Sequence, residues 1–509
     1  MNFRPVLCVA VTMITAIVLM CKLFVSQNAR LVVLFVFGTL IIASVAALII
    51  YKKTFFKFLL IITIAFMVPA ISVYIRSDMI NSNHDLNVEN CVIFGKIYKI
   101  NEKLDKNFVD VYLTDVELVN ENNRNGLYGN YLLRVNSNNF DLSKINEGRY
   151  IKCKTKPSFY SLNSGKDRDI SFIARDITGF SYVYSYNVFV TEENRPELRD
   201  NIKSRIYNYF EKTDLFFTGV GYAMMFGDST MLDDSVYGVF ESSGIIHLLA
   251  VSGFHVSVIV GFIMFVLKKL KFKNIANFFI TAAIIFFYAY LCNFSVSVVR
   301  AGIMSLLSIY ASMTNKECDR MSSMSTALIF ILLINPLDLF NVSFVLSFVA
   351  VLSIILLLPV FERLFSKVFS EKLSGMLSLS ISTSIGITAF QLYYFGQAPI
   401  LSFLSNLITV PIVSVLFVFL LISILIGPLF GLVVPLINFF GIGIRFILQI
   451  NNWIVGVGLF IFTNRVRDIT LLLSVLLMYA VSDYLFIKRK NRIMLASLVG
   501  GLLLSLLVF

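Results

Sequence analysis

The residues best placed to do chemistry in this 509-residue chain lie in one short polar stretch between apolar residues. His247 and His255, two of the three histidines, flank the pair Ser252 and Gly253. Imidazole and hydroxyl groups donate and accept hydrogen bonds, and an ionisable group at membrane depth marks a pathway for a polar solute by default. Ser252 and His255 are three residues apart, so this stretch could also supply a nucleophile and a base.

Three further polar side chains stand in apolar runs later in the chain: Arg300, Gln391 and Asn406. Arginine carries a permanent charge, and the two amides are uncharged donors and acceptors. We predict that these residues, together with the stretch around Ser252, line or brace a path through a membrane. Polar residues in spanning helices also form interhelical hydrogen bonds, which leaves a purely structural role open.

Membrane-spanning helices must position these residues. Hydrophobic residues make up 57% of the chain and charged residues 15%, and apolar runs recur along most of its length. The run from Ile245 to Leu267 is long enough to cross a bilayer, because about 20 helical residues suffice. No ordinary soluble core needs so many apolar residues. The predicted fold class is therefore a polytopic α-helical membrane protein with about 12–13 crossings.

The positive charges, +12 in excess overall, gather in short loops beside apolar runs. The positive-inside rule places these loops in the cytoplasm, and the alternation of crossings then places residues 76–243 and the C-terminus outside. The loop charges are Lys52, Lys53 and Lys57, then Lys268, Lys269, Lys271 and Lys273, then Arg363, Lys367 and Lys372, and finally Lys488, Arg489, Lys490 and Arg492.

Four segments follow from this pattern. They are three transmembrane helices in residues 1–75, an extracytoplasmic OB-like β domain in 76–195, amphipathic surface helices in 196–243 and a transmembrane channel domain with broken helices in 244–509. Prolines and glycines after Gly396 supply the breaks. Broken helices need protein or water around them at membrane depth.

The outer domain is predicted as a small β-barrel, because short β-forming runs alternate with Asn, Asp, Gly and Lys turns. OB-like barrels can hold single-stranded nucleic acid in a basic groove with stacking aromatics. Lys152, Lys154 and Lys156 alternate onto one strand face, and Tyr98 could stack beside them. Residues 76–200 carry 17 Lys and Arg against 18 Asp and Glu, a net charge of −1, so ordinary solvated strand residues are the alternative.

Cysteine use fits an extracytoplasmic domain. Cys91 and Cys153 are its only cysteines, and the strands that carry them are commonly neighbours in a barrel of the OB type. We predict a Cys91–Cys153 disulfide, which an oxidising compartment permits, with two unrelated buried thiols as the alternative. Neither metal-ligand spacing nor a phosphate-binding glycine-rich loop occurs in the sequence. We therefore expect no metal, no cofactor and no enzyme activity.

Several motifs together resemble the ComEC family of competence proteins, the DNA-uptake channels of naturally transformable bacteria. The outer domain is similar to that family's N-terminal OB-like region. The other motifs follow in the family's order: Gly227-Asp228 with Gly244, His247 through His255 with Gly261, Ser297 through Met304, Asn335-Pro336 through Phe348, and Phe395-Gly396-Gln397 through Pro411.

The resemblance implies a channel that passes single-stranded DNA inward across the bacterial cytoplasmic membrane during natural transformation. It also implies partners: membrane lipids, an outer DNA receptor that delivers the strand and a cytosolic ATP-driven motor that collects it. Many family members continue into a metallo-β-lactamase-like domain. No such domain follows the last apolar run here, so we expect a separate nuclease. A homo-oligomer is compatible with the sequence, which does not specify the number of copies.

Two other functions fit the same residues. A membrane transporter or flippase for another anionic polymer or lipid would need the same buried cation and hydrogen-bonding groups. An intramembrane hydrolase would use Ser252 with His255, although no carboxylate lies nearby in sequence to orient the histidine. Uptake of labelled DNA into the cytosol, scored after deletion of the gene, separates the channel from the transporter.

Overall fold

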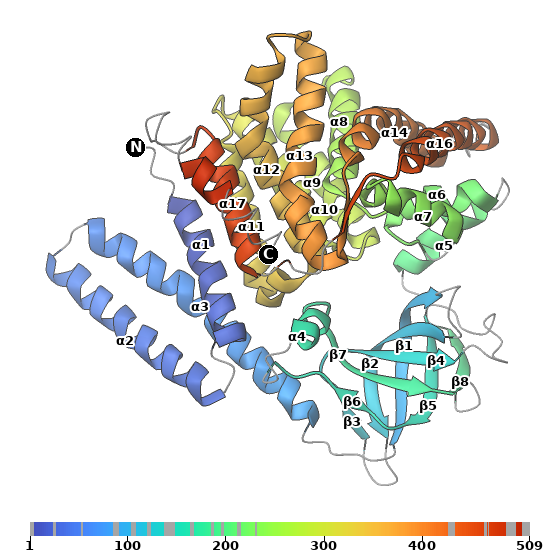
Figure 1. Ribbon diagram of the computed structural model, residues 1–509. Coiled ribbons are helices and arrows are strands. Elements are labelled where there is room, and N and C mark those ends of the chain that lie inside the picture. Colours follow the sequence, from blue (N-terminus) through green and yellow to red (C-terminus); the bar gives the residue numbers. More distant parts are fainter. Residues whose placement is uncertain are drawn as a thin grey trace. The chain divides into compact units, whose positions relative to one another are not determined.

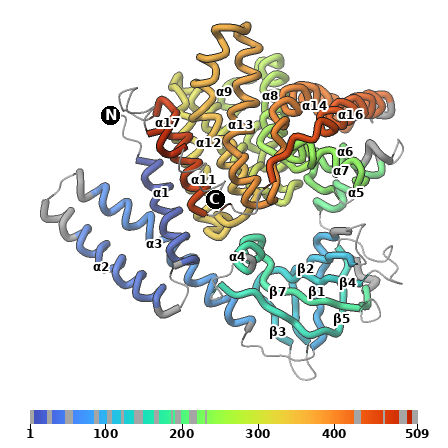
Figure 2. The backbone as a smooth tube through the Cα atoms, viewed as in Figure 1, coloured from blue at the N-terminus to red at the C-terminus, as the bar shows by residue number. Residues whose placement is uncertain are grey.

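The fold combines apolar helices with one larger β-sheet, and the chain divides into two units (Figure 1; Figure 2). Unit 1 comprises Met1–Ser204 and Ser325–Asn341, and unit 2 comprises Arg205–Met324 and Val342–Phe509. The computed structural model describes residues 5–23, 27–51, 54–84, 91–102, 108–119, 124–136, 148–162, 167–184, 188–194, 198–210, 215–229, 232–425, 433–462, 466, 468–484 and 495–500.

Unit 1 begins with three apolar helices. They are α1 (Pro5–Val18), which continues into the π-helix η1 (Leu19–Leu23), α2 (Gln27–Tyr51) and α3 (Thr54–His84). Helix α3 packs against both α1 and α2. Arg30 of α2 is fully buried and donates hydrogen bonds to three oxygens. These belong to the Met20 carbonyl, the Ser77 hydroxyl and the Leu162 carbonyl, so Arg30 ties the helices to a loop of the β domain.

The sheet of unit 1 has the strand order β6-β7-β4-β2-β1-β5-β8, with β3 paired to β2. Neighbouring strands are antiparallel except β4 and β7, which are parallel. The strands are β1 (Cys91–Glu102), β2 (Phe108–Val119), β3 (Arg124–Gly126), β4 (Asn130–Asn136), β5 (Arg149–Thr155), β6 (Ser158–Phe159), β7 (Ile177–Val183) and β8 (Val188–Asn194).

One face of this sheet encloses a hydrophobic core, which includes the fully buried Ile93, Val111 and Leu133. Along β1 the buried Ile93 alternates with the half-buried Val92 and Phe94, because successive side chains of a strand point to opposite faces. The short helix α4 (Asp167–Ile173) packs against β7. Asp110 is buried and accepts two hydrogen bonds from Arg134, from Nε at 2.5 Å and from Nη2 at 2.8 Å.

The predicted Cys91–Cys153 disulfide is absent from the structure, where both thiols are free. Strands β1 and β5 are neighbours, but their register pairs Cys153 with Ile93 and Cys91 with Thr155. The cysteines are therefore diagonal, and diagonal positions lie about 7–8 Å apart, beyond the span of a relaxed disulfide. Burial raises the pKa of Cys91 to about 11 and that of Cys153 to about 12, so both thiols are poorly reactive.

The chain passes from unit 1 to unit 2 within α5 (Leu198–Phe210), and unit 2 then opens with short elements. These are α6 (Leu215–Phe226), α7 (Asp234–Ser242) and the 3-10 turn η5 (Ile246–Leu248). Helix α11 (Arg320–Ile334) starts in unit 2 and ends in unit 1, which also holds the 3-10 turn η6 (Pro336–Phe340).

Longer helices form the body of unit 2. They are α8 (Gly253–Lys269), α9 (Asn274–Leu291), α10 (Val296–Met313), α12 (Val342–Phe365), α13 (Glu371–Phe395), α14 (Ser402–Leu425), α16 (Val433–Gly456) and α17 (Asp468–Val481). Two short strands, β9 (Gln397–Pro399) and β10 (Phe460–Phe462), pair with each other. Helix α8 packs against α9, α10 and α14, and α10 also packs against α12.

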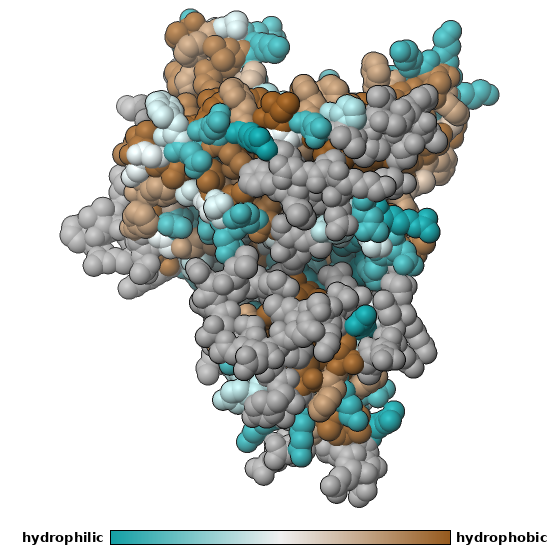
Figure 3. Space-filling view, turned by 90° about the vertical axis from the view of Figure 1, so that its right-hand side faces the viewer, coloured by the Kyte–Doolittle hydropathy of each residue, from teal (hydrophilic) through white to brown (hydrophobic). Residues whose placement is uncertain are grey.

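Eight of the described helices are long and apolar enough to cross a membrane: α1, α3, α9, α10, α12, α13, α14 and α16. Shorter apolar helices occur in α2, α11 and α17. Exposed hydrophobic side chains such as Phe265, Phe279 and Phe286 lie on the helices of unit 2, and Figure 3 shows hydrophobic surface there. A multi-pass membrane protein is therefore supported, and most of the predicted last crossing lies outside the described residues.

Candidate functional site

The polar stretch around Ser252 forms the start of α8. Ser252 has an extended backbone, with φ −118° and ψ 166°, and it forms a capping box with His255. The Ser252 backbone N–H donates to His255 Nδ1 at 3.1 Å, and the Ser252 hydroxyl lies 3.2 Å from the same nitrogen. Serine is among the preferred N-cap residues, because its hydroxyl satisfies backbone N–H groups that the helix leaves free.

This cap fixes the proton on the His255 ring. Because Nδ1 accepts the Ser252 N–H, the proton of the neutral imidazole sits on Nε2. The side chain is 0% exposed, and Nε2 is buried with no hydrogen-bond partner in the part of the chain that the structure describes. His255 therefore presents an unused N–H donor to the interior of unit 2.

The same contact weakens the hydrolase alternative. In a serine–histidine pair, one ring nitrogen takes the serine proton while a third group orients the ring through the other nitrogen. Here both Ser252 contacts converge on Nδ1, and Nε2 lacks an orienting partner. The geometry is that of a reciprocal helix cap.

His255 and Gly253 face different neighbours, since positions two apart on a helix point to nearly opposite sides. The His255 ring lies 4.7 Å from the Phe417 ring of α14, measured between centroids. A Cβ atom at Gly253 would come within 2.8 Å of Arg300 Nη2 and 3.3 Å of the Ala301 Cβ on α10. Helix α8 is thus wedged between α10 and α14, and glycine leaves room for the guanidinium.

Arg300 is a buried charge without an acidic partner among the described residues. Arg300 is only 6% exposed, and its Nη1 donates a hydrogen bond to the Ser347 carbonyl of α12. The guanidinium carbon lies 5.6 Å from the Phe348 ring centroid, and Nε has no hydrogen-bond partner. Burying a charge without an opposite charge is costly. Arg300 is therefore a candidate functional residue.

His247 differs from His255. The expectation of one helix from Ile245 is wrong at its start, because His247 lies in the 3-10 turn η5 and α8 begins only at Gly253. The extended backbone of Ser252 interrupts helical geometry between the two histidines. His247 is exposed, and it does not share a helical stripe with His255.

The two predicted amides lie elsewhere in unit 2. Gln391 is half-buried near the end of α13, and Asn406 is half-buried in α14 with a buried, unpartnered Oδ1. One turn further along α14, the Thr409 hydroxyl accepts a hydrogen bond of 3.0 Å from Asn451 Nδ2 of α16. No contact of either predicted amide with Arg300 is recorded among the described residues.

The sequence did not lead us to predict a role for four side chains of this region: Ser347, Phe348, Phe417 and Asn451. The first two stand at the end of a recognised motif but had no assigned role. Asn451 could have been identified from the sequence, because it is a polar residue in an apolar run. In the structure it is fully buried. Phe417 is one of 49 phenylalanines, and no pattern distinguishes it before folding.

The predicted lysines of the β domain share an exposed face. Lys152 and Lys154 are exposed on β5, where they alternate with buried Ile151 and Cys153, and Lys156 is exposed just beyond the strand. The alternation therefore holds in the sheet as the sequence indicates.

Aromatic side chains lie beside these lysines, but the predicted aromatic residue, Tyr98, is not among them. The strand registers place Lys152 between Phe94 of β1 and Phe189 of β8, and Phe189 is 65% exposed. The Phe94 ring stacks on Tyr150 with centroids 5.2 Å apart. Tyr98 lies beyond the paired part of β1 and β5, with its ring 6.1 Å from that of Tyr112. Tyr98 is half-buried, which raises the pKa of its hydroxyl, so its ring is not a fully exposed stacking platform.

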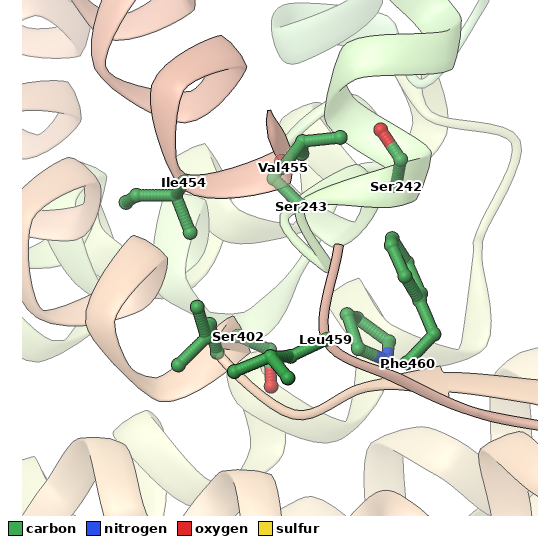
Figure 4. Close-up of a pocket in the computed structure, with 9 residues that line it drawn as sticks. Ser242, Ser243, Ser402, Ile454, Val455, Leu459 and Phe460 are labelled. Atoms are coloured by element: carbon green, nitrogen blue, oxygen red, sulfur yellow. The ribbon is translucent and has the colours of Figure 1, made fainter. Parts of the chain in front are cut away.

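Among the residues that the structure describes, no three His, Cys, Asp or Glu side chains come together as metal ligands would. A small pocket lies where α7 ends and α14 begins, with β10 beside it (Figure 4). Its lining combines apolar side chains with Ser242, Ser243 and Ser402 and includes no predicted site residue.

Apolar helices that hold a buried histidine and a buried arginine define the class as a multi-pass membrane protein with an internal polar site. The family model described as Competence protein matches residues 224–488, which is more than half of the chain and includes this site, and the chain belongs to that family. The predicted resemblance is thereby confirmed.

A curated relative supports the same relationship over a shorter segment. The chain is 28% identical over 131 residues to ComE operon protein 3 of Bacillus subtilis (strain 168). The aligned part covers 26% of this chain and 17% of that protein, so the chain spans less than a fifth of the relative's length. No solved structure matches the chain.

Proposed function

We propose that this protein carries single-stranded DNA inward across the bacterial cytoplasmic membrane during natural transformation. The observation that carries the proposal is Arg300, which is buried inside the family-matched region with no acidic partner among the described residues. A polyanion that crosses a bilayer loses the hydration of its phosphates, so its path needs positive and hydrogen-bonding groups in place of water. Arg300 and the unused N–H donor of His255 supply such groups.

The proposed orientation puts the β domain outside and the lysine-rich loops inside. Two contacts support it. Arg76 of α3 donates to the Ile334 carbonyl at the end of α11, and Arg76 begins the segment predicted to be outside. Arg363 near the end of α12 pairs with Asp483 beyond α17, and Arg363 belongs to a loop predicted to be inside. Helices that cross with the expected parity bring such ends together.

The β domain is proposed to be OB-like and to receive the strand. An antiparallel run β1-β2-β4, a parallel pair β4–β7 and an antiparallel pair β1–β5 support this assignment. The exposed face with Lys152, Lys154, Phe94 and Phe189 combines cations with aromatic rings, as single-strand surfaces do. Salt-dependent binding of single-stranded DNA would support this role, and no binding at low salt would refute it.

Other components complete the proposed pathway. An outer receptor delivers DNA, a separate nuclease removes the second strand, and a cytosolic ATP-driven motor draws the imported strand. The protein itself acts as a conduit and not as an enzyme. Its only direct ligands in this proposal are the strand and the surrounding lipids.

Import of DNA tests the proposal. We expect that cells lacking the gene fail to bring fluorescently labelled DNA into the cytosol, and that Arg300→Ala or His255→Ala fails to restore import at normal membrane abundance. Unchanged import with these variants would discard the two residues as path elements. Unchanged import in the deletion strain, with altered distribution of another anionic polymer or lipid, would favour the transporter or flippase instead.

A further inference from the structure

Three long helices of unit 2 begin at one place. Gly253 is the first residue of α8, Arg300 lies in the second turn of α10, and Ser347 lies in the second turn of α12. Arg300 approaches Gly253 through Nη2 and bonds the Ser347 carbonyl through Nη1. The hydroxyls of Ser297 and Ser347 add a hydrogen bond of 3.0 Å between the starts of α10 and α12.

This arrangement concentrates positive charge. A helix carries about half a positive elementary charge at its N-terminus, because its first backbone N–H groups have no partner inside the helix. The N-terminus of α8 lies beside Arg300, which adds a full charge, whereas α12 offers Arg300 the Ser347 carbonyl as an acceptor. No ion pair of Arg300 is recorded among the described residues, and its Nε is buried and unpartnered. Repulsion among these groups is relieved when an anion binds between them.

We propose that Arg300 and the first turn of α8 form a binding site for a phosphate group of a phosphodiester. Arg300 Nε and the backbone N–H groups that open α8 are donors, which suits an anionic oxygen and not a cation. Resting on the proposed function, the site engages one phosphate of the strand at a time. A lipid headgroup offers the same chemistry, so the experiment includes both sources.

Gly253 is the positioning residue of this site. A methyl group at this position would lie 2.8 Å from Arg300 Nη2 and would push the guanidinium away from the helix end. Gly253→Ala therefore keeps the charge but changes its place. We expect weaker phosphodiester binding in this variant with no change in the number of phosphates bound.

The test uses the full-length protein in maltoside detergent, which contains no phosphate. The probes are a 12-residue oligothymidylate, the same oligomer with neutral methylphosphonate linkages, and short-chain phosphatidylglycerol. We expect the phosphodiester oligomer to bind, and Arg300→Gln to weaken binding by about tenfold or more, since a charged hydrogen bond contributes about 1.5–3 kcal/mol. Arg320→Gln is the matched control, because Arg320 is exposed, and its affinity should equal that of the wild type.

Should Arg300→Gln fail to fold, the question is decided with protein in which Lys152 and Lys154 are replaced by Gln, so that the lysine face of the β domain contributes little to binding. Equal binding of phosphodiester and methylphosphonate oligomers would overturn the phosphate site, and so would an unchanged affinity of folded Arg300→Gln. Binding of phosphatidylglycerol but not of the oligomer would assign the site to lipid and overturn its role on the strand. DNA import into cells is scored separately. If import requires the gene but the purified protein binds no phosphodiester oligomer, only the phosphate site is rejected. If the protein binds the oligomer but import does not require the gene, only the proposed function is rejected.

Discussion

The β domain and the helical unit hold their arginines in different ways. In the sheet, Arg134 meets Asp110 through two hydrogen bonds and lies 5.7 Å from the Tyr182 ring centroid. In the helical unit, Arg300 has one backbone carbonyl, one aromatic ring and no carboxylate among the described residues. Arg30, in the helices of unit 1, is intermediate, because it bonds three neutral oxygens.

The difference separates a structural charge from a functional one. Arg134 neutralises a buried carboxylate, so the pair serves the stability of the sheet. A counter-charge at Arg300 would compete with a passing anion, so its absence suits a site that must bind a mobile ligand. The comparison therefore predicts that changes at Arg134 affect folding, whereas changes at Arg300 affect transport.

The largest expected effect is on DNA import. Arg300→Gln removes the charge but keeps similar volume, and loss of a buried charged contact of about 3 kcal/mol corresponds to a decrease in import of about 100-fold. Import of labelled DNA and membrane abundance of the protein are measured together. Arg320→Gln, at an exposed arginine, should import normally. Normal import by Arg300→Gln would remove the distinction between the two units.

A large effect on folding is expected in the sheet. Arg134→Ala leaves Asp110 buried and unpaired, which costs about 3 kcal/mol. The buried thiols of Cys91 and Cys153 report the opening of the sheet, so labelling by a thiol reagent should accelerate strongly. The control is Arg124→Ala, whose exposed pair with Glu117 is 4.0 Å long and contributes little. Equal labelling rates in both variants would contradict a structural role of Arg134.

The cap at Ser252 gives a smaller effect. Ser252→Ala removes the hydroxyl but not the backbone N–H bond to His255, and loss of an N-cap costs about 1 kcal/mol. Thermal unfolding should shift to lower temperature, while DNA import stays within a few-fold of the wild type. Hydrolytic turnover by the purified wild type that disappears in Ser252→Ala would restore the hydrolase alternative.

The lysine face of the β domain should act through salt-dependent affinity. Each phosphate neutralised on single-stranded DNA contributes about 0.7 to the slope of log K against log salt, so replacing Lys152 and Lys154 by Gln should lower that slope by about 1.4. Titrations of full-length protein at several salt concentrations measure it. Lys268→Gln, in a predicted cytoplasmic loop, is the control. An unchanged slope would leave these lysines as ordinary solvated residues.

The smallest effect concerns pH. Asp338 of η6 has its pKa raised to about 7 by burial, which outweighs the opposing influence of Arg76. The folded state then binds more protons than the unfolded state between about pH 4 and 7, so stability should fall as pH rises through this window and level off above it. Thermal unfolding at pH 5–8 measures the trend, and Asp338→Asn should flatten it. An unchanged trend in that variant would assign the pH dependence to another group.

The sequence alone determined the class of this protein and the identity of its main polar residues. Run length and the scarcity of charge require spanning helices, because a soluble core cannot bury so many apolar residues. Alternation along β5 indicated the exposed lysines, since side chains change face at every residue of a strand. Arg300 and His255 could be identified as candidate functional residues, because a polar residue at membrane depth is costly and such residues usually have a role.

Only the tertiary structure decided how these residues combine. The register between β1 and β5 offsets Cys91 from Cys153, which no strand pattern reveals before pairing. The cap at Ser252 divides the predicted helix and separates His247 from His255. The approach of Arg300 to Gly253 and Ser347 depends on helix packing between segments far apart in the chain, and such packing follows from three-dimensional fit and not from local periodicity.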